Sequence, residues 1–189
     1  MEEARELQYL QIGDLETVLR RTGWKAKPPP GISLRAADPA AEAALIARLY
    51  NDAFACEPLE TITPQDVTHF AWHSGLVAFR VVIAEEEGLA VGLAVGRVEV
   101  RAAGDRSLQG AVELVAVRPG YRRRGVGRAL AYHLMQWLKE RGAALVGATA
   151  ENPVVVDVLV SYGFQPAEPL SLGARTLPLQ EPNKANLTE

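Results

Sequence analysis

The sequence has few of the features that mark secreted or membrane-bound proteins. Among its 189 residues there is a single cysteine, Cys56, so no internal disulfide can form and the chain suits a reducing compartment. No apolar run approaches the roughly 20 residues that a transmembrane helix requires. The opening segment MEEARELQYL lacks the basic and apolar regions of a secretory signal. We therefore expect a cytoplasmic protein with no membrane partner.

An excess of positive charge is also missing. The chain has 20 Lys and Arg against 23 Asp and Glu, a net charge of -3, so nothing attracts nucleic acid to the protein as a whole. Metal ligands are scarce as well. His69 and His73 have the spacing of paired ligands, but no glutamate follows His69 and no third ligand is evident nearby. We expect neither a nucleic-acid partner nor a metal.

What the sequence does contain is the pattern of one α/β domain. Residues 77–85 and 89–101 flank a Gly-containing turn and predict a hairpin. The other predicted strands are 32–35, 111–117, 144–148 and material from Phe164 and 176–179, and the predicted helices are 38–54, 63–75, 124–141 and 153–162. Hairpins followed by strands that enclose a long helix predict a mixed, mostly antiparallel sheet of six to seven strands with helices on both faces.

Residues 1–30 differ from the rest of the chain. A weak helical pattern over 7–24 ends at three consecutive prolines, Pro28 to Pro30, which favour a stiff connector. We interpret 1–30 as a helical appendage that docks on the domain or on a partner, with a partly ordered tail as the alternative. The domain then covers 31–180, and 181–189 form a C-terminal tail. Leu10, Leu15 and the connector are candidates for a homodimer contact.

A candidate anion site follows the strand 111–117. Gly125 and Gly127 leave room for backbone N–H groups to converge on a phosphate, and the helix that begins there adds its partial positive charge. Arg122, Arg123 and Arg124 supply charged donors. A pyrophosphate would suit this site. The P-loop and the dinucleotide fingerprint are excluded, because Gly127 is followed by Arg128-Ala129-Leu130 rather than by Lys-Ser/Thr or a third glycine.

At this segment the chain resembles the GCN5-related N-acetyltransferase (GNAT) family. The family pattern, Arg/Gln-x-x-Gly-x-Gly/Ala after a strand ending in Val-x-Pro, is matched by Val117-x-Pro119 and by Arg122-x-x-Gly125-x-Gly127. Asn152 precedes Gly163-Phe164 as a family asparagine does, and the order of elements over 32–166 is also similar. The resemblance implies the GNAT-like acyl-CoA N-acyltransferase fold with acetyl-CoA as co-substrate.

The resemblance also implies which residues bind the coenzyme. The main chain of Val115, Ala116 and Val117 would pair with the pantetheine arm, and Asn152 would contact the coenzyme across a gap between the two central strands. The pyrophosphate would lie on the turn and first helical residues, namely Arg122, Arg123, Arg124, Gly125, Val126, Gly127 and Arg128. We expect transfer of the acetyl group to a primary amine of a small molecule or protein, by direct attack in a ternary complex. The alternative is a non-catalytic acyl-CoA-binding regulatory module.

Two residues are candidates for proton transfer. A lysine-like amine has a pKa of about 10.4 and must lose a proton before it attacks. Glu113 is the candidate base, because strand alternation would place it on the apolar face of Ala111, Val115 and Val117, where its pKa would rise. The alternative is an ion pair with Arg97 or Arg101.

The acid that protonates the departing thiolate is less evident. The family often has a tyrosine where Leu159 stands. Tyr162, about one helical turn further on, is the remaining candidate, although packing in the core explains it better. A thiol of pKa about 8.5 is a tolerable leaving group without such an acid.

By the same resemblance, the first two helices of the domain and their connection would line the acceptor pocket. The candidate contacts are Cys56, Glu57, Glu60, His69, Phe70, Trp72 and His73. Packing or solvent exposure explains each of them equally well. Glu57, Glu60, Asp66 and Glu113 would make this side acidic and would favour a cationic acceptor.

Overall fold

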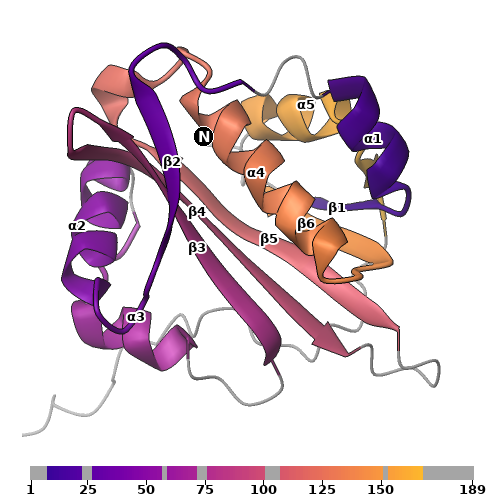
Figure 1. The fold of residues 1–189 in the computed structure, drawn as a ribbon, viewed down its shortest axis with the longest axis horizontal. Helices are drawn as coiled ribbons and strands as arrows, with labels where there is room; N and C mark the ends of the chain where they lie inside the picture. Colours follow the sequence, from indigo (N-terminus) through magenta and orange to yellow (C-terminus); the bar gives the residue numbers. More distant parts are fainter. Residues whose placement is uncertain are drawn as a thin grey trace, which may run out of the picture.

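The chain is described by a computed structural model that covers residues 8–22, 27–56, 59–71, 76–100, 107–150 and 153–167. The strands are β1 (Gln8–Ile12), β2 (Ile32–Ala37), β3 (Leu76–Glu86), β4 (Leu89–Val100), β5 (Leu108–Val117), β6 (Leu145–Ala150) and β7 (Gln165–Pro166). The helices are α1 (Leu15–Thr22), α2 (Ala43–Phe54), α3 (Pro64–Ala71), α4 (Val126–Glu140) and α5 (Pro153–Ser161), and a short 3-10 turn covers Pro119–Tyr121. Figure 1 shows their arrangement.

The strands form one mixed sheet in the order β2-β3-β4-β5-β6-β1-β7. All neighbours are antiparallel except β5 and β6, which are parallel because α4 carries the chain back between them. The predicted mixed, mostly antiparallel sheet with helices on both faces is confirmed. The hairpin of β3 and β4 turns at Glu87 and Gly88, which both have positive φ.

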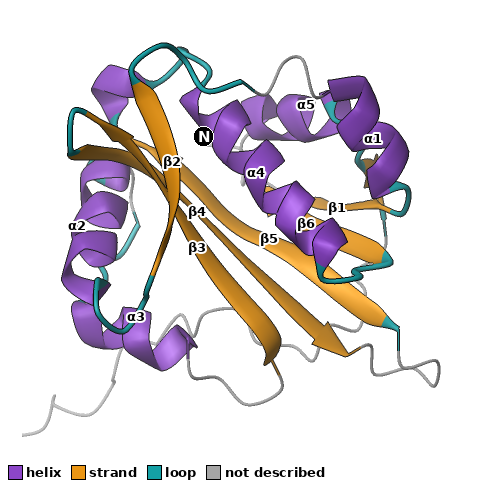
Figure 2. Cartoon of the chain, viewed as in Figure 1, coloured by secondary structure: helices purple, strands orange, loops and turns teal. Residues whose placement is uncertain are grey.

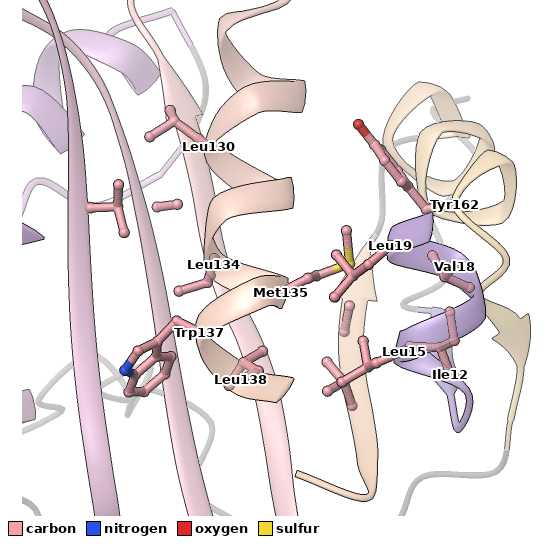
Figure 3. Packing of buried hydrophobic residues seen from close by; sticks show 14 of the residues in the cluster. Ile12, Leu15, Val18, Leu19, Leu130, Leu134, Met135, Trp137, Leu138 and Tyr162 are labelled. Carbon is pink, nitrogen blue, oxygen red and sulfur yellow. The ribbon is translucent and has the colours of Figure 1, made fainter. Parts of the chain in front are cut away.

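Helices cover the two faces of the sheet unequally. α4 lies diagonally across one face with α1 beside it, whereas α2 and α3 pack on the other face (Figure 2). The core of the first face is built around Leu130, Leu134 and Leu138, each fully buried. Figure 3 shows these side chains directed at the strands, while Met135 on the same helix meets Leu19 of α1. α4 is thus held between the sheet and α1.

Close approach of α4 to the sheet depends on a glycine of β4. A Cβ added to Gly96 would lie 2.8 Å from Leu134 Cδ1 and 3.1 Å from the carbonyl oxygen of Ala111. Any side chain there would push the helix away from the strands. This packing fixes where α4 begins, and its first turn lies next to the C-terminal end of β5.

The described residues within 1–30 do not form the predicted helical appendage. β1 is an internal strand, antiparallel to β6 on one side and to β7 on the other. Leu10 is 1% exposed, and α1 buries Leu15 and Leu19 in the same core as α4. The connector also lies against the domain, since a Cβ on Gly125 would be 3.8 Å from Pro29 Cγ. The boundary drawn at residue 30 therefore divides a single sheet and a single core.

Candidate functional site

The two parallel strands of the sheet separate where the sequence predicts the coenzyme. β5 pairs with β6 only over residues 109–112, opposite 145–148. From Glu113 to Val117 the β6 side of β5 has no partner strand among the described residues, although the other side stays paired with β4. The predicted gap between the central strands is therefore present. It exposes backbone groups at the C-terminal end of β5 to an extended ligand.

The segment that leads from β5 into α4 has the backbone geometry of an anion site. Arg123 has φ 60° and Gly125 has φ 90°, both in the left-handed region. Left-handed residues in such a turn let successive N–H groups point into one concavity. The first helical hydrogen bond runs from Ala129 N–H to the Gly125 carbonyl. The N–H groups of Val126, Gly127 and Arg128 therefore lack helical acceptors and remain for a ligand.

The arginines of this loop do not all have the same role. Arg122 donates from Nε to the Val117 carbonyl at 3.0 Å and from Nη2 to the Ala53 carbonyl at 2.5 Å. Arg124 donates to Glu86 Oε1 at 2.9 Å, and its guanidinium lies 5.0 Å from the ring centroid of Tyr121. These two side chains hold the loop in shape.

Arg123 and Arg128 differ from them. Within the described part of the chain, neither guanidinium forms an ion pair or donates a hydrogen bond. Arg123 and Arg128 are both exposed. Both positive charges thus lie beside the free N–H groups at the start of α4, where an anion would also benefit from the helix dipole.

Glu113 is not on the face that its strand pattern predicts. Leu114 pairs with Val95 and Val112 with Gly96, so Glu113 is the extra residue of a β-bulge. The bulge changes the alternation, and Val115 faces α4 while Glu113 points to the opposite face. There its Oε1 accepts a hydrogen bond of 2.6 Å from Arg97 Nε. The expected apolar environment is wrong, and the alternative of an ion pair with Arg97 is confirmed.

Arg97 connects two carboxylates on this face. Its Nη1 lies 3.4 Å from Glu99 Oε2 in addition to the contact with Glu113. The Glu113 side chain is 27% exposed. Glu113 thus lies at the point where β5 leaves β6, accessible and on the face that α2 and α3 cover.

Tyr162 packs in the core of the α4 face. It is 3% exposed, and its hydroxyl donates a hydrogen bond of 3.4 Å to the carbonyl of Arg128. Burial raises the pKa of Tyr162 to about 12, partly opposed by the nearby Arg128 charge. This geometry agrees with the packing role; whether Tyr162 also donates a proton stays a prediction. Leu159, at the position of the family tyrosine, packs against the same core.

Several predicted contacts lie outside the described residues. They are Asn152, Glu57, Trp72, His73, Arg101 and the strand material at 176–179. Among the described acceptor candidates, Cys56, Glu60 and His69 are exposed.

Among the residues that the structure describes, no three His, Cys, Asp or Glu side chains are grouped as a metal site would need. No described helix is both long and apolar enough to cross a membrane.

The sequence pattern did not identify three residues that contribute to the site. They are Asn51, Asp52 and Ala53 in the last turn of α2. Asp52 Oδ2 accepts a hydrogen bond of 2.6 Å from Arg118, although 66 positions separate the two residues in the chain. No local motif indicates such a pair, because it depends on α2 packing beside β5.

The fold is similar to that of several solved structures. An acetyltransferase from Trypanosoma brucei is 19% identical, with a TM-score of 0.59 over 79% of this chain and 99% of that chain. An aminoglycoside N-acetyltransferase, AAC(6')-Iy, solved in complex with CoA, is 19% identical with a TM-score of 0.56, over 80% and 95% of the two chains. At these identities the likeness shows the fold alone.

A third similar structure is much longer than this chain. It is a fungal multi-domain β-N-acetylglucosaminidase with a GCN5-related glucosamine N-acetyltransferase region, 17% identical with a TM-score of 0.58. The match covers 74% of this chain and only 17% of that chain. No curated protein matches the sequence.

The family itself is shown by the sequence. The model of the acetyltransferase (GNAT) family matches residues 46–164, from α2 through the end of α5. This range includes the β5–β6 gap, the arginine-glycine loop and α4. The chain belongs to the GNAT family of acetyltransferases.

Proposed function

We propose that the protein transfers an acetyl group from acetyl-CoA to a primary amine of a small molecule or protein. The observation that carries this proposal is the unpaired edge of β5 leading directly into the loop and N-terminus of α4. An extended pantetheine arm suits the edge at Val115, Ala116 and Val117, and a pyrophosphate suits the free N–H groups of α4. Asn152 is proposed as a further contact from beyond β6.

The charges of the loop support the same arrangement. Arg123 and Arg128 are the arginines that we assign to direct contact with the phosphates, whereas Arg122 and Arg124 shape the loop. Gly125 takes the left-handed conformation that starts α4. Val126 and Gly127 contribute main-chain N–H groups. The thioester would then lie near Glu113, where β5 and β6 separate.

The reaction proceeds by direct attack in a ternary complex. The neutral amine attacks the thioester carbonyl carbon, and the nitrogen passes its proton to the Glu113 carboxylate. The C–S bond of the tetrahedral intermediate breaks, and the thiolate of coenzyme A leaves and takes a proton from solvent. The products are an amide and free coenzyme A. The hydrogen bond from Arg97 orients the Glu113 carboxylate toward the acceptor side.

Turnover tests this proposal. The protein is incubated with acetyl-CoA and a panel of amines, and free thiol is measured; aminoglycosides belong in the panel because one similar structure is an aminoglycoside N-acetyltransferase. Glu113→Gln is expected to lower kcat about a hundredfold or more, because the proton acceptor is lost. Glu99→Gln is the matched control, since Glu99 contacts the same arginine but lies away from the gap. Equal turnover in both variants would contradict a role for Glu113.

A non-catalytic acyl-CoA-binding module is the second candidate. It is favoured by Leu159, which occupies the position of the family's usual acid, and by the involvement of Glu113 in an ion pair. Tight binding of acetyl-CoA with no release of thiol across the amine panel would decide for this module. Turnover of any amine would decide against it.

A further inference from the structure

The last turn of α2 contacts both sides of the proposed active site. Three consecutive residues, Asn51, Asp52 and Ala53, each bind a different segment of the chain. Asn51 binds Ile62, two residues before α3; Asp52 binds Arg118, directly after β5; and Ala53 binds Arg122 in the loop that precedes α4. We call these three residues the α2 junction.

On the acceptor side, Asn51 holds the start of α3. Its Nδ2 donates to the Ile62 carbonyl at 2.9 Å, and its Oδ1 accepts from Ile62 N–H at 2.9 Å. Thr63 follows at once and caps α3, accepting from Asp66 N–H at 3.3 Å. α2 and α3 share a core on the sheet face to which Glu113 points. A displacement of the α2 end would therefore move the start of α3.

On the coenzyme side, two arginines bind the same turn. Arg118, directly after β5, donates to Asp52 Oδ2 at 2.6 Å, and its side chain is 19% exposed. Arg122 joins the carbonyl of Ala53 to that of Val117, at the end of the unpaired β5 edge. The Ala53 carbonyl lies in the last turn of α2, where carbonyls commonly take partners from outside the helix, and this arginine is such a partner. Both arginines flank the 3-10 turn that begins the anion loop.

We propose that the α2 junction transmits occupation of the coenzyme loop to the start of α3, with Asn51 and Asp52 as its positioning residues. This inference rests on the proposed function, since it requires coenzyme A to bind the loop. Ordering of the loop by phosphates fixes Arg118 and Arg122. They in turn fix the end of α2, and Asn51 fixes Ile62. Binding of the coenzyme thereby stabilises the contacts that position the acceptor side of the site.

Amide hydrogen exchange of the full chain, with and without coenzyme A, tests this coupling without knowledge of the acceptor. Coenzyme A is expected to slow exchange in residues 118–129 and, in addition, to slow it about threefold or more in residues 59–71. Asn51→Asp removes one of the two hydrogen bonds to Ile62, and Asp52→Asn removes the ion pair with Arg118. The double variant is expected to keep protection of 118–129 but to lose the coenzyme-dependent change in 59–71.

Asp157→Asn serves as the control, because Asp157 is exposed on α5; it is expected to behave as the wild type. Protection of 118–129 in the wild type with no change in 59–71 would overturn the inference while leaving the proposed function intact. A change in 59–71 that persists in the folded double variant would overturn it too. No coenzyme-dependent change in 118–129 would refute the proposed function, and this inference with it.

Discussion

At the scale of single residues, backbone conformation and side-chain partners separate groups that look equivalent in the sequence. Arg122, Arg123 and Arg124 are consecutive and all exposed, yet the first and third are bonded to the protein and only the second has no partner among the described residues. Arg123 also adopts φ 60°, which is unfavourable for a residue with a side chain. Such strain in a loop is found where a ligand requires the geometry.

Tyr162 gives a prediction at this scale. Its raised pKa of about 12 means that the folded state holds the phenolic proton more tightly than the unfolded state, whose pKa is about 10. The resulting stabilisation is complete below pH of about 10 and is lost as the pH rises through about 12. Thermal unfolding of the wild type is therefore expected to depend more steeply on pH in this window than that of Tyr162→Phe.

The same variant tests catalysis. Because the Tyr162 hydroxyl is bonded to the Arg128 carbonyl inside the core, Tyr162→Phe is expected to change kcat by less than about threefold, well below the effect of losing a general acid. A loss of a hundredfold at neutral pH, with the fold intact, would instead establish Tyr162 as the acid.

At the scale of elements, the packing of α4 on the sheet determines where the anion loop lies. The helix approaches β4 at Gly96, where a Cβ would be 2.8 Å from Leu134 Cδ1 and 3.1 Å from a backbone carbonyl. Leu134 is fully buried in a close-packed core. The loop and its N–H groups are thus positioned by packing about two turns further along the helix.

Gly96→Ala is accordingly expected to lower the free energy of unfolding by about 1–3 kcal/mol, the usual cost of overpacking. Urea denaturation followed by circular dichroism measures it. Gly147→Ala on β6 is the matched control, because a Cβ there would lie 4.0 Å from the Leu10 carbonyl oxygen, an ordinary contact distance. Equal stability of the two variants would show that α4 does not depend on the glycine contact.

Local patterns were sufficient to predict the elements whose apolar residues repeat regularly. The β3–β4 hairpin, α4 and the loop before it were predicted because turn glycines and helical spacing are visible in a few consecutive residues. β1 was missed because Leu10 in the strand and Leu15, Val18 and Leu19 in α1 have the spacing of one continuous helix. The face of Glu113 was missed because a bulge depends on the partner strand.

At the scale of the whole molecule, the N-terminal segment completes the sheet. β1 covers the edge of β6 that would otherwise be unpaired, and it contributes Leu10 to the main core. The strand lies on the far side of β6 from the gap, so it holds in place one wall of the proposed coenzyme site.

Leu10→Ala is expected to destabilise the protein by about 2–5 kcal/mol, as removal of a fully buried leucine does. Gln8→Ala, at the exposed start of the same strand, is expected to change stability by less than about 0.5 kcal/mol. Both are measured by urea denaturation. If Leu10→Ala were as stable as Gln8→Ala, residues 8–12 would be an appendage and the internal position of β1 would be contradicted.

The central claim is that the loop between β5 and α4 binds the phosphates of coenzyme A, and isothermal titration calorimetry with coenzyme A tests it most directly. The wild type is expected to bind one equivalent. Arg123→Gln with Arg128→Gln is expected to weaken binding by about tenfold or more, since two charge-assisted contacts are lost. Arg48→Gln, an exposed arginine of α2, is expected to leave the affinity unchanged. Undiminished affinity in the double variant, or no binding by the wild type, would contradict the account.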